Sequence, residues 1–367
     1  MPSPTENMTG GRVRVIAEAG VNHNGQIDLA LRLVDAATKA GADVIKFQTF
    51  KADLLATENA SKASYQIRQT GADASQFEML KGLELDYEDF GRIAAVCADR
   101  GIEFLSTPFD LESLHFLARD LGLRTVKLGS GEVTNAPMLV EAARLGRDII
   151  LSTGMSTLAE VGEALGAIAF GYVGGSAEPS WQKFGEARKS AAGVDAICSR
   201  VAVLHCTSQY PAPANEANLR ALDTLRAEFG TVVGLSDHAE GMVVSFAAVA
   251  RGAQLIEKHL TLDRTMRGPD HAASLEPREF SDLVAGIRTI EGALGDGIKE
   301  PQPSELETRG VARRSLATLK PVSKGETFNN GNLGALRPGT AISPMRYWEW
   351  LGRTADRDYR AGELIGE

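Results

Sequence analysis

The sequence predicts an α/β barrel followed by a small C-terminal domain of a different design. Short apolar runs alternate with longer segments of helical spacing, and there are eight such runs. Polar residues follow every run at the same end, and the alternation stops near Gly295. Strand–helix alternation implies a parallel sheet covered by helices, and eight repeats favour closure into a barrel. An open, doubly wound sheet is the alternative.

The apolar runs are the predicted strands. They are Arg14–Ala19, Asp43–Phe47, Ile102–Ser106, Thr125–Leu128, Asp148–Ser152, Val201–His205, Thr231–Leu235 and Ala253–Lys258. The segments between and after them are the predicted helices: Leu29–Ala40, Tyr87–Arg100, Leu111–Leu121, Ala136–Leu145, Thr157–Phe170, Leu219–Phe229, Met242–Arg251 and Pro277–Leu294. In the first, apolar residues recur at helical spacing and Gly41 provides a C-cap.

Two insertions interrupt this rhythm. Thr49–Asp86 is a long polar segment after the second strand, which we interpret as a lid or a subunit-contact loop. Gly171–Ser199 precedes the sixth strand and contains a Gly-Gly pair, proline and mixed charge. A segment that leads into a strand lies at the back of the barrel, where structure can vary without touching the chemistry.

The composition divides the chain into a barrel domain over 1–294, a linker over 295–313 and a small domain over 314–367. The linker is polar and contains Pro301 and Pro303. The last segment has only ~50 residues, so we expect it to have little core of its own and to dock on another surface.

Overall composition excludes several classes of protein. Hydrophobic residues make up 43% and charged residues 24% of the 367 residues, which is ordinary for a globular protein. The formal net charge of −9 argues against nucleic acid and anionic membranes as partners. Three cysteines without a CxxC motif predict a reducing compartment and no disulfide framework. No apolar run approaches the ~20 residues of a membrane span, and Met1–Gly10 resembles a terminal tail rather than a signal peptide. These features predict a cytoplasmic protein.

Cationic and hydroxyl side chains follow the predicted strands, at the end where barrel enzymes carry their active sites. Two ammonium groups with converging hydroxyls suit a phosphate group. The alternative for each hydroxyl is that it caps the next helix. The candidate residues are Lys46, Lys127, Thr107, Ser130, Ser152, Ser208 and Ser236.

Histidines and carboxylates occupy the same end. His238 and His259 follow adjacent strands and can share a divalent metal, or they can be a hydrogen-bonded pair. Glu18 ends the first strand near the lysines, where an ionised carboxylate could orient substrate or move a proton. For the other acidic residues, structural ion pairs are the alternative. They are Glu132, Asp237 and Asp270.

Motifs spread over the chain resemble those of the sialic acid synthases, which condense phosphoenolpyruvate with an N-acetylated amino sugar. The matching stretches are IAEAGVNHNG (Ile16–Gly25), VIKFQT (Val44–Thr49), STPFD (Ser106–Asp110), KLGSGE (Lys127–Glu132), LSTGM (Leu151–Met155), LHCTSQYPAP (Leu204–Pro213), GLSDH (Gly234–His238), EKHLTLD (Glu257–Asp263), RGPDHAASLEP (Arg267–Pro277) and ARRSL (Ala312–Leu316). LRPGTAISP (Leu336–Pro344) is similar to the C-terminal antifreeze-like (SAF) domain of that family.

The resemblance implies a TIM barrel, (β/α)8, whose antifreeze-like domain reaches into the active site of the partner in a domain-swapped homodimer. It implies a divalent metal on His238 and His259, manganese before magnesium or cobalt. Phosphoenolpyruvate would be held by Lys46, Thr107, Lys127, Ser130, Ser152, Ser208 and Ser236, although many members have Asn in place of Ser208. The sugar would be held by Gln48, Tyr210, Asp270 and the partner subunit's Arg337. Glu18 would be the catalytic carboxylate, with Glu132 beside it.

The function implied is that of a nonulosonic acid synthase. Phosphoenolpyruvate, N-acetylmannosamine or a related sugar, and water would give an N-acetylneuraminate-type 2-keto acid and phosphate, with cleavage of the C–O bond. The PDHAASLEP form, with His271, makes legionaminic acid synthesis from 2,4-diacetamido-2,4,6-trideoxymannose the alternative. Two other classes stay open: an aldolase that forms a Schiff base on Lys46 or Lys127, and a sugar- or ice-binding protein suggested by the C-terminal domain.

Overall fold

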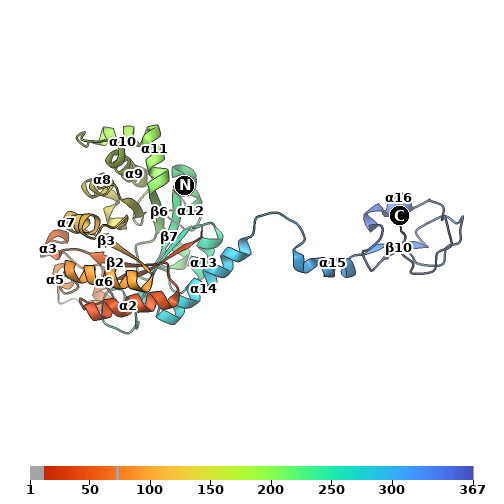
Figure 1. The fold of residues 1–367 in the computed structure, drawn as a ribbon, viewed down its shortest axis with the longest axis horizontal. Helices are drawn as coiled ribbons and strands as arrows, with labels where there is room; N and C mark the ends of the chain where they lie inside the picture. Colours follow the sequence, from red (N-terminus) through yellow and green to blue (C-terminus); the bar gives the residue numbers. More distant parts are fainter. Residues whose placement is uncertain (1–11, 72–73, 367) are drawn as a thin grey trace. The chain divides into compact units, whose positions relative to one another are not determined.

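The computed structural model describes residues 12–71 and 74–366, and Figure 1 shows the chain as a ribbon. The chain forms two compact units, the first ending at Gly295 and the second beginning at Asp296. The sequence predicts a linker from residue 295. The predicted tail at Met1–Gly10 lies outside the described residues.

The first unit is a parallel eight-stranded sheet, as predicted. Neighbouring strands are hydrogen bonded in the order β3-β2-β1-β8-β7-β6-β5-β4, and the end strands β3 and β4 contact each other, which brings the sheet close to a full barrel. The strands are β1 (Arg14–Gly20), β2 (Val44–Thr49), β3 (Glu103–Pro108), β4 (Thr125–Leu128), β5 (Asp148–Ser152), β6 (Val201–Cys206), β7 (Val232–Asp237) and β8 (Leu255–His259). The prediction of a barrel rather than an open sheet is therefore confirmed.

Side chains alternate between the two faces of each strand. One buried cluster draws only on strand residues, and we assign it to the barrel interior: Ile16, Val44, Leu105, Ile150, Ala202, Leu204, Val232 and Leu255. A larger cluster contains the intervening strand residues, such as Val15, Ala17 and Ile45, together with the apolar faces of the helices. The barrel thus has an inner layer of side chains and an outer layer beneath its helices.

The helices that cover the barrel follow the predicted segments closely. They are α2 (Ile27–Ala40), α6 (Tyr87–Arg100), α7 (Leu111–His115), α8 (Ala136–Arg144), α9 (Leu158–Val173), α12 (Ala221–Phe229), α13 (Val243–Ala250) and α14 (Pro277–Leu294). α7 continues into a π-helical turn over Phe116–Asp120. Gly41 ends α2 with a φ of 81°, a left-handed conformation that glycine adopts without the strain of a Cβ atom.

The two insertions are helical rather than irregular. The first contains α3 (Ala52–Leu55), α4 (Ser64–Thr70) and α5 (Gln76–Lys81). The second contains α10 (Trp181–Lys189) and α11 (Ala191–Arg200), which pack on α9 (Figure 1). α10 approaches α9 closely at Gly166, where a Cβ atom would lie 2.8 Å from the carbonyl oxygen of Phe184.

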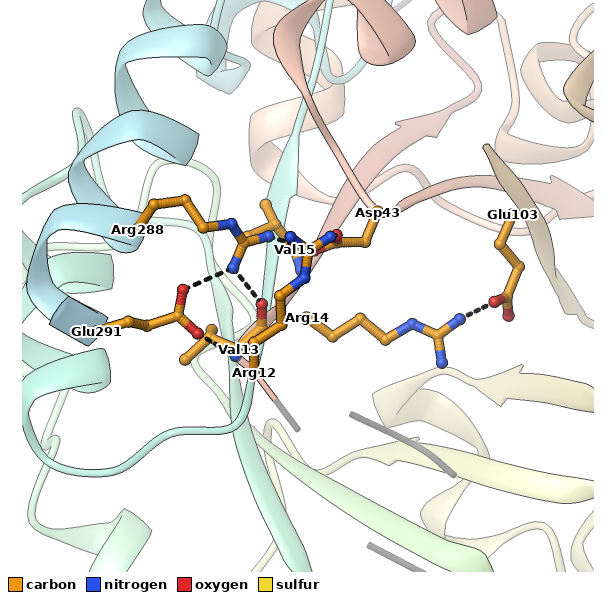
Figure 2. A network of polar contacts seen from close by, with 8 residues as sticks. All are labelled: Arg12, Val13, Arg14, Val15, Asp43, Glu103, Arg288 and Glu291. Carbon is orange, nitrogen blue, oxygen red and sulfur yellow. Dashed lines mark hydrogen bonds and ion pairs between the residues drawn. The ribbon is translucent and has the colours of Figure 1, made fainter. Parts of the chain in front are cut away.

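A charge network closes the end of the barrel where the strands begin (Figure 2). The Arg288 guanidinium of α14 donates to the Val13 carbonyl at 2.6 Å and lies 2.6 Å from the Asp43 carboxylate. Asp43 also accepts from the Val15 amide at 2.8 Å and pairs with Arg12. Each side chain in this network meets a partner of opposite charge or a backbone group, so the network ties β1, β2 and α14 together.

The second unit has a core of its own, unlike our expectation from its size. Strands β9 (Ser315–Thr318) and β10 (Leu333–Leu336) pair antiparallel, and α15 (Leu306–Ala312) lies within the predicted linker. α16 (Tyr347–Trp350) is a single short turn. Turns bring distant apolar side chains together in one buried cluster: Leu316, Val322, Phe328, Leu333, Ile342, Ala355, Tyr359 and Ile365. Within the described ranges, no helix of either unit has the length and apolar character that crossing a bilayer requires.

Candidate active site

A cavity lies at the carboxyl ends of the strands, and we call it the polar cavity. Its wall includes side chains from strands β1 to β3 and β5 to β8 and from the loops that follow them. The lining residues are Glu18, Lys46, Gln48, Ala63, Tyr65, Thr107, Phe109, Lys127, Gly129, Ser130, Gly131, Ser152, Met155, Cys206, Ser208, Tyr210, Ser236, His238, Glu257 and His259. Lys127 adds a side chain from β4, so all eight strands contribute.

The two-residue repeat of the strands explains why these side chains converge. Glu18 lies two residues after the inner core residue Ile16, Lys46 lies two residues after Val44, and Glu257 lies two residues after Leu255. The same strand face that fills the barrel lower down therefore presents charged groups at its top. The pairing register completes the arrangement, because Glu18 lies opposite Lys46 on one neighbouring strand and opposite His259 on the other.

Four charged side chains form a buried group beneath the cavity. Lys46 Nζ lies 2.6 Å from Glu18 Oε2 and 3.7 Å from Glu257 Oε2, and Lys127 Nζ lies 3.6 Å from Glu257 Oε1. Ser236 Oγ donates to Glu257 Oε1 at 2.9 Å. All four charged residues are less than 5% exposed. Charges this deep are retained only when they are paired, and here two ammonium groups balance two carboxylates.

Their surroundings give the carboxylates of Glu18 and Glu257 different affinities for a proton. Burial opposes ionisation of Glu257, but the charges of Lys127 and Lys46 and the Ser236 hydrogen bond outweigh it and lower its pKa to about 2. Burial raises the pKa of Glu18 above its ordinary value, against the opposing charge of Lys46. Glu257 is therefore a fixed negative charge, whereas Glu18 is the carboxylate suited to exchanging a proton.

His238 and His259 lie side by side at the rim, with ring centroids 5.5 Å apart. His238 Nδ1 contacts the Thr207 carbonyl oxygen at 2.8 Å, which leaves its Nε2 as the acceptor. Burial lowers the pKa of His259 well below its ordinary value, so its imidazole is neutral, and its Nδ1 has no hydrogen-bond partner among the described residues.

The ring nitrogens of these two histidines fit a divalent metal, which binds imidazole in its neutral form. With metal–nitrogen bonds of about 2 Å, ring centroids on one ion lie roughly 5 Å apart, close to the spacing here. In the part of the chain that the structure describes, no third His, Cys, Asp or Glu completes such a group. A metal bound here would keep positions open for water or substrate oxygen.

The hydroxyl groups surround the opposite side of the cavity. Thr107 Oγ1 accepts from Lys46 Nζ at 3.2 Å, and Ser130 Oγ accepts from the Gly154 amide at 2.9 Å. Ser152 Oγ is buried and has no hydrogen-bond partner among the described residues. A Cβ atom at position 154 would lie 2.2 Å from Ser208 Oγ, so the Ser208 side chain packs directly on the backbone of Gly154. Polar groups without partners beside two lysines indicate a site for an anion.

A second cavity adjoins the first, and we call it the apolar-walled cavity. It shares Gln48, Tyr65, Phe109, Tyr210 and His259 with the polar cavity. Its other lining residues are Val21, Phe50, Leu55, Gln66, Gln76, Met79, Leu80, Leu83, Pro269 and Asp270. The aromatic rings of Tyr65 and Tyr210 lie 4.9 Å apart where the two cavities meet, and the Tyr210 ring lies 4.1 Å from that of His238.

The structure brings most of the residues predicted for the site into the two cavities. Asp270 lines the apolar-walled cavity, where burial and the charge of Glu18 raise its pKa to about 7. Glu132 lines neither cavity, and its Oε2 accepts from Asn135 Nδ2 at 2.6 Å. Arg337 belongs to the second unit, where its side chain is exposed.

Two further residues near the site have structural partners. Asp237 points away from the cavity and pairs with Lys258 at 3.0 Å. His271 uses one ring nitrogen on Thr261 and the other on Asn24.

Glu257 and Tyr65 are two of the lining residues to which the sequence analysis assigned no role. Glu257 was visible in the sequence, since it follows Leu255 at the spacing that places Glu18 and Lys46. Tyr65 carries no such signal, because it lies on a short helix of the insertion, and only the folded chain brings it to Tyr210.

Comparison with known proteins gives the family. The NeuB family model matches residues 33–299. N,N'-diacetyllegionaminic acid synthase of Campylobacter jejuni is 46% identical and covers 96% of this chain and 98% of its own length. The enzyme of the same name from Legionella pneumophila is 42% identical and covers 96% of this chain and 92% of its own length.

A solved structure agrees with this assignment. The N-acetylneuraminic acid (sialic acid) synthetase of Leptospira borgpetersenii superposes with a TM-score of 0.64 at 33% identity, covering 81% of this chain and 90% of that one. The chain therefore belongs to the NeuB family and is a nonulosonate synthase, a phosphoenolpyruvate-dependent enzyme of the transferase type.

Proposed function

We propose that the chain condenses phosphoenolpyruvate with an N-acetylated amino sugar and water to give a nonulosonic acid and phosphate. The observation that carries this proposal is the polar cavity itself. Two buried lysines, two buried carboxylates and two buried histidines face one space at the strand ends. This set can bind an anion, polarise an aldehyde and move a proton, which are the three requirements of the reaction.

Phosphoenolpyruvate would bind on the hydroxyl side of the polar cavity. Lys46 and Lys127 would meet its charge, and its oxygens would accept hydrogen bonds from the hydroxyls of Thr107, Ser130, Ser152, Ser208 and Ser236. The lysines are already balanced by Glu18 and Glu257. An anion therefore needs a further positive charge, from a metal on the histidines or from a proton taken up by Glu18.

The bond changes balance as follows. The double bond of phosphoenolpyruvate supplies the electron pair by which its C3 attacks the sugar aldehyde carbon, and the aldehyde oxygen takes a proton. Water adds to the cationic C2 and loses its proton. The C2–O bond to phosphate then breaks and the C2 hydroxyl passes its remaining proton to the leaving group, which releases inorganic phosphate and leaves a 2-keto acid.

Glu18 is the residue that we assign to proton transfer and to stabilising the charge at C2. It lies opposite both Lys46 and His259 in the strand register, between the anion side and the histidine side of the cavity. Its raised pKa lets it take the proton from the attacking water and return to the ionised form.

His238 and His259 would hold the divalent metal, with Mn²⁺ expected before Mg²⁺ or Co²⁺. When bound, the metal polarises the aldehyde oxygen of the open-chain sugar as a Lewis acid. The Thr207 carbonyl oxygen fixes the orientation of His238, as partners of metal-binding histidines commonly do.

The sugar would extend from the histidines past Gln48, Tyr210 and Asp270. We favour 2,4-diacetamido-2,4,6-trideoxymannose as the acceptor, since the two synthases with 46% and 42% identity are both named for N,N'-diacetyllegionaminic acid. N-acetylmannosamine is the second candidate, favoured by the likeness to the Leptospira sialic acid synthetase.

We further propose that the enzyme acts as a domain-swapped homodimer in the cytoplasm. The partner subunit's Arg337 would then add a cation to the sugar site, since that residue is exposed in a unit separate from the barrel. Cys97, Cys198 and Cys206 are all free thiols, which suits a reducing compartment.

The test uses the full chain with Mn²⁺, each sugar and phosphoenolpyruvate that carries ¹⁸O in its bridging oxygen. We expect phosphate release with the label in phosphate, because the C–O bond breaks. The proposal would be contradicted if the label stayed in the keto acid. It would also be contradicted if phosphoenolpyruvate were consumed in the presence of neither sugar. A chelator should abolish turnover, and added Mn²⁺ should restore it.

A further inference from the structure

The insertion after β2 builds one wall of the apolar-walled cavity, next to the residues that would meet the aldehyde. Five of its apolar side chains line this cavity: Phe50, Leu55, Met79, Leu80 and Leu83. Together with Val21 and Phe109 they form a hydrophobic cluster that is separate from the barrel core. The insertion is thus a lining element and not only a surface loop.

The two cavities are continuous through five shared residues, among them His259 and Tyr210. The aldehyde carbon has to lie near His238 and His259 and within reach of phosphoenolpyruvate in the polar cavity. The apolar-walled cavity adjoins that position, and we place the rest of the acceptor sugar in it. Its distal end, the carbons farthest from the aldehyde, would contact the insertion.

The chemistry of this wall is selective. The amides of Gln66 and Gln76 are its polar groups from the insertion, and Asp270 is its one carboxylate. An apolar wall accommodates a methyl group but leaves a hydroxyl group without partners, which costs free energy. Gln66 Oε1 already accepts from the Ala63 amide at 2.9 Å, so Gln66 can offer its amide N–H groups and Gln76 both its N–H groups and its oxygen to an acylamino group.

We propose that Leu55, Gln66, Gln76, Met79, Leu80 and Leu83 form a distal subsite that selects acceptors ending in a methyl group and carrying a second N-acyl group. This inference rests on the proposed function and defines its sugar class. Tyr65 lines both cavities beside Tyr210, with the two rings tilted by 36° and their centroids 4.9 Å apart, at the boundary between the subsite and the polar cavity.

Two adjacent leucines of α3 provide a matched test. Leu55 lines the cavity, whereas Leu54 is 56% exposed and does not. The experiment measures kcat/KM for 2,4-diacetamido-2,4,6-trideoxymannose and for N-acetylmannosamine in the full chain with Mn²⁺. A hydrophobic pocket discriminates between such sugars by about 10–100-fold, which is the preference expected of the unmodified enzyme.

Leu55→Asn is expected to reduce that preference about tenfold, with the KM for phosphoenolpyruvate within about twofold, because the polar cavity is unchanged. Leu54→Asn should leave both values unchanged. Leu55→Met restores an apolar surface, so recovery of the preference would separate recognition from a folding defect.

Equal losses for both sugars in Leu55→Asn, no loss for either, or a wild-type preference for N-acetylmannosamine would each overturn the subsite. None of these results affects the proposed condensation. If the unmodified enzyme consumes phosphoenolpyruvate with neither sugar, the proposed function itself fails.

Discussion

Both ends of the barrel hold charged side chains in polar contacts, but the two ends use them differently. Where the strands begin, Asp43, Arg288 and Glu291 are joined to one another or to backbone groups of β1 (Figure 2). Where the strands end, Ser152 Oγ and His259 Nδ1 are buried without partners in the described residues, and the charges face a cavity. Charged groups whose partners lie within the protein stabilise the fold, whereas polar groups without partners beside a cavity are available to bind a ligand.

The difference between the two ends of the barrel is tested most directly by neutralising one carboxylate at each end. Glu18→Gln removes the group assigned to proton transfer and should lower kcat about 10³-fold. Glu291→Gln, at the opposite end, should leave kcat within about twofold. Phosphate release measures both. If Glu18→Gln retained more than a tenth of the activity, the assignment of Glu18 would be wrong.

Lys127→Met tests the anion side. Lys127 is 3% exposed and burial lowers its pKa, so its charge is held there at a cost and removal should matter for ligand binding. We expect kcat/KM for phosphoenolpyruvate to fall about 10²-fold, the effect of losing one charged hydrogen-bond donor. The matched change Arg288→Met should act on stability instead. Equal kinetic effects of the two variants would remove the distinction between the ends.

Replacing Asp270 should raise the stability of the fold and lower its activity. Its carboxyl has a pKa of about 7 in the folded chain against an ordinary value of 3.8, so the unfolded chain loses the proton first as pH rises. The ionised group therefore destabilises the fold progressively between those values, and the full effect is present above them. Asp270→Asn should add about 4 kcal/mol of stability at pH 8 and nothing near pH 4, while sugar kcat/KM falls.

Thermal unfolding of Asp270→Asn and the unmodified chain across that pH range checks this expectation. A difference in Tm that is independent of pH would show that the carboxyl is not held in its protonated form.

The smallest effect is expected at Asp43. Asp43→Asn weakens the pairs with Arg288 and Arg12 and the bond from the Val15 amide, at a site that is partly open to solvent. Stability should fall by about 1–2 kcal/mol, with kcat within about twofold. Chemical denaturation gives the first quantity and steady-state kinetics the second. A large loss of kcat would mean that the two ends are coupled.

Much of the barrel could be predicted because its signals are local. Each strand is a short apolar run, and the two-residue repeat that buries Ile16 and Leu204 also aims Glu18 and Cys206 at the cavity. The predicted lid or contact loop was harder to interpret. Its helices fold against residues remote in sequence, as the contact of Tyr65 with Tyr210 shows, and periodicity carries no information about such pairs.

The second unit was underestimated for a related reason. Leu316 and Ile365 lie far apart in the sequence of this unit, and turns rather than regular elements bring them into one cluster. Residue counts predict how much apolar surface is available but not how efficiently turns gather it.

The pair of Asp237 and Lys258 has a consequence for protein engineering. These residues are partners in the strand register, and each directly precedes one of the two rim histidines. Because adjacent residues point to opposite faces, an outward ion pair held by Ser245 also fixes which way His238 and His259 point. Transferring only the two histidines to another barrel would move the imidazole groups without the ion pair that orients them. A transplant should therefore move four residues and the helix that carries Ser245.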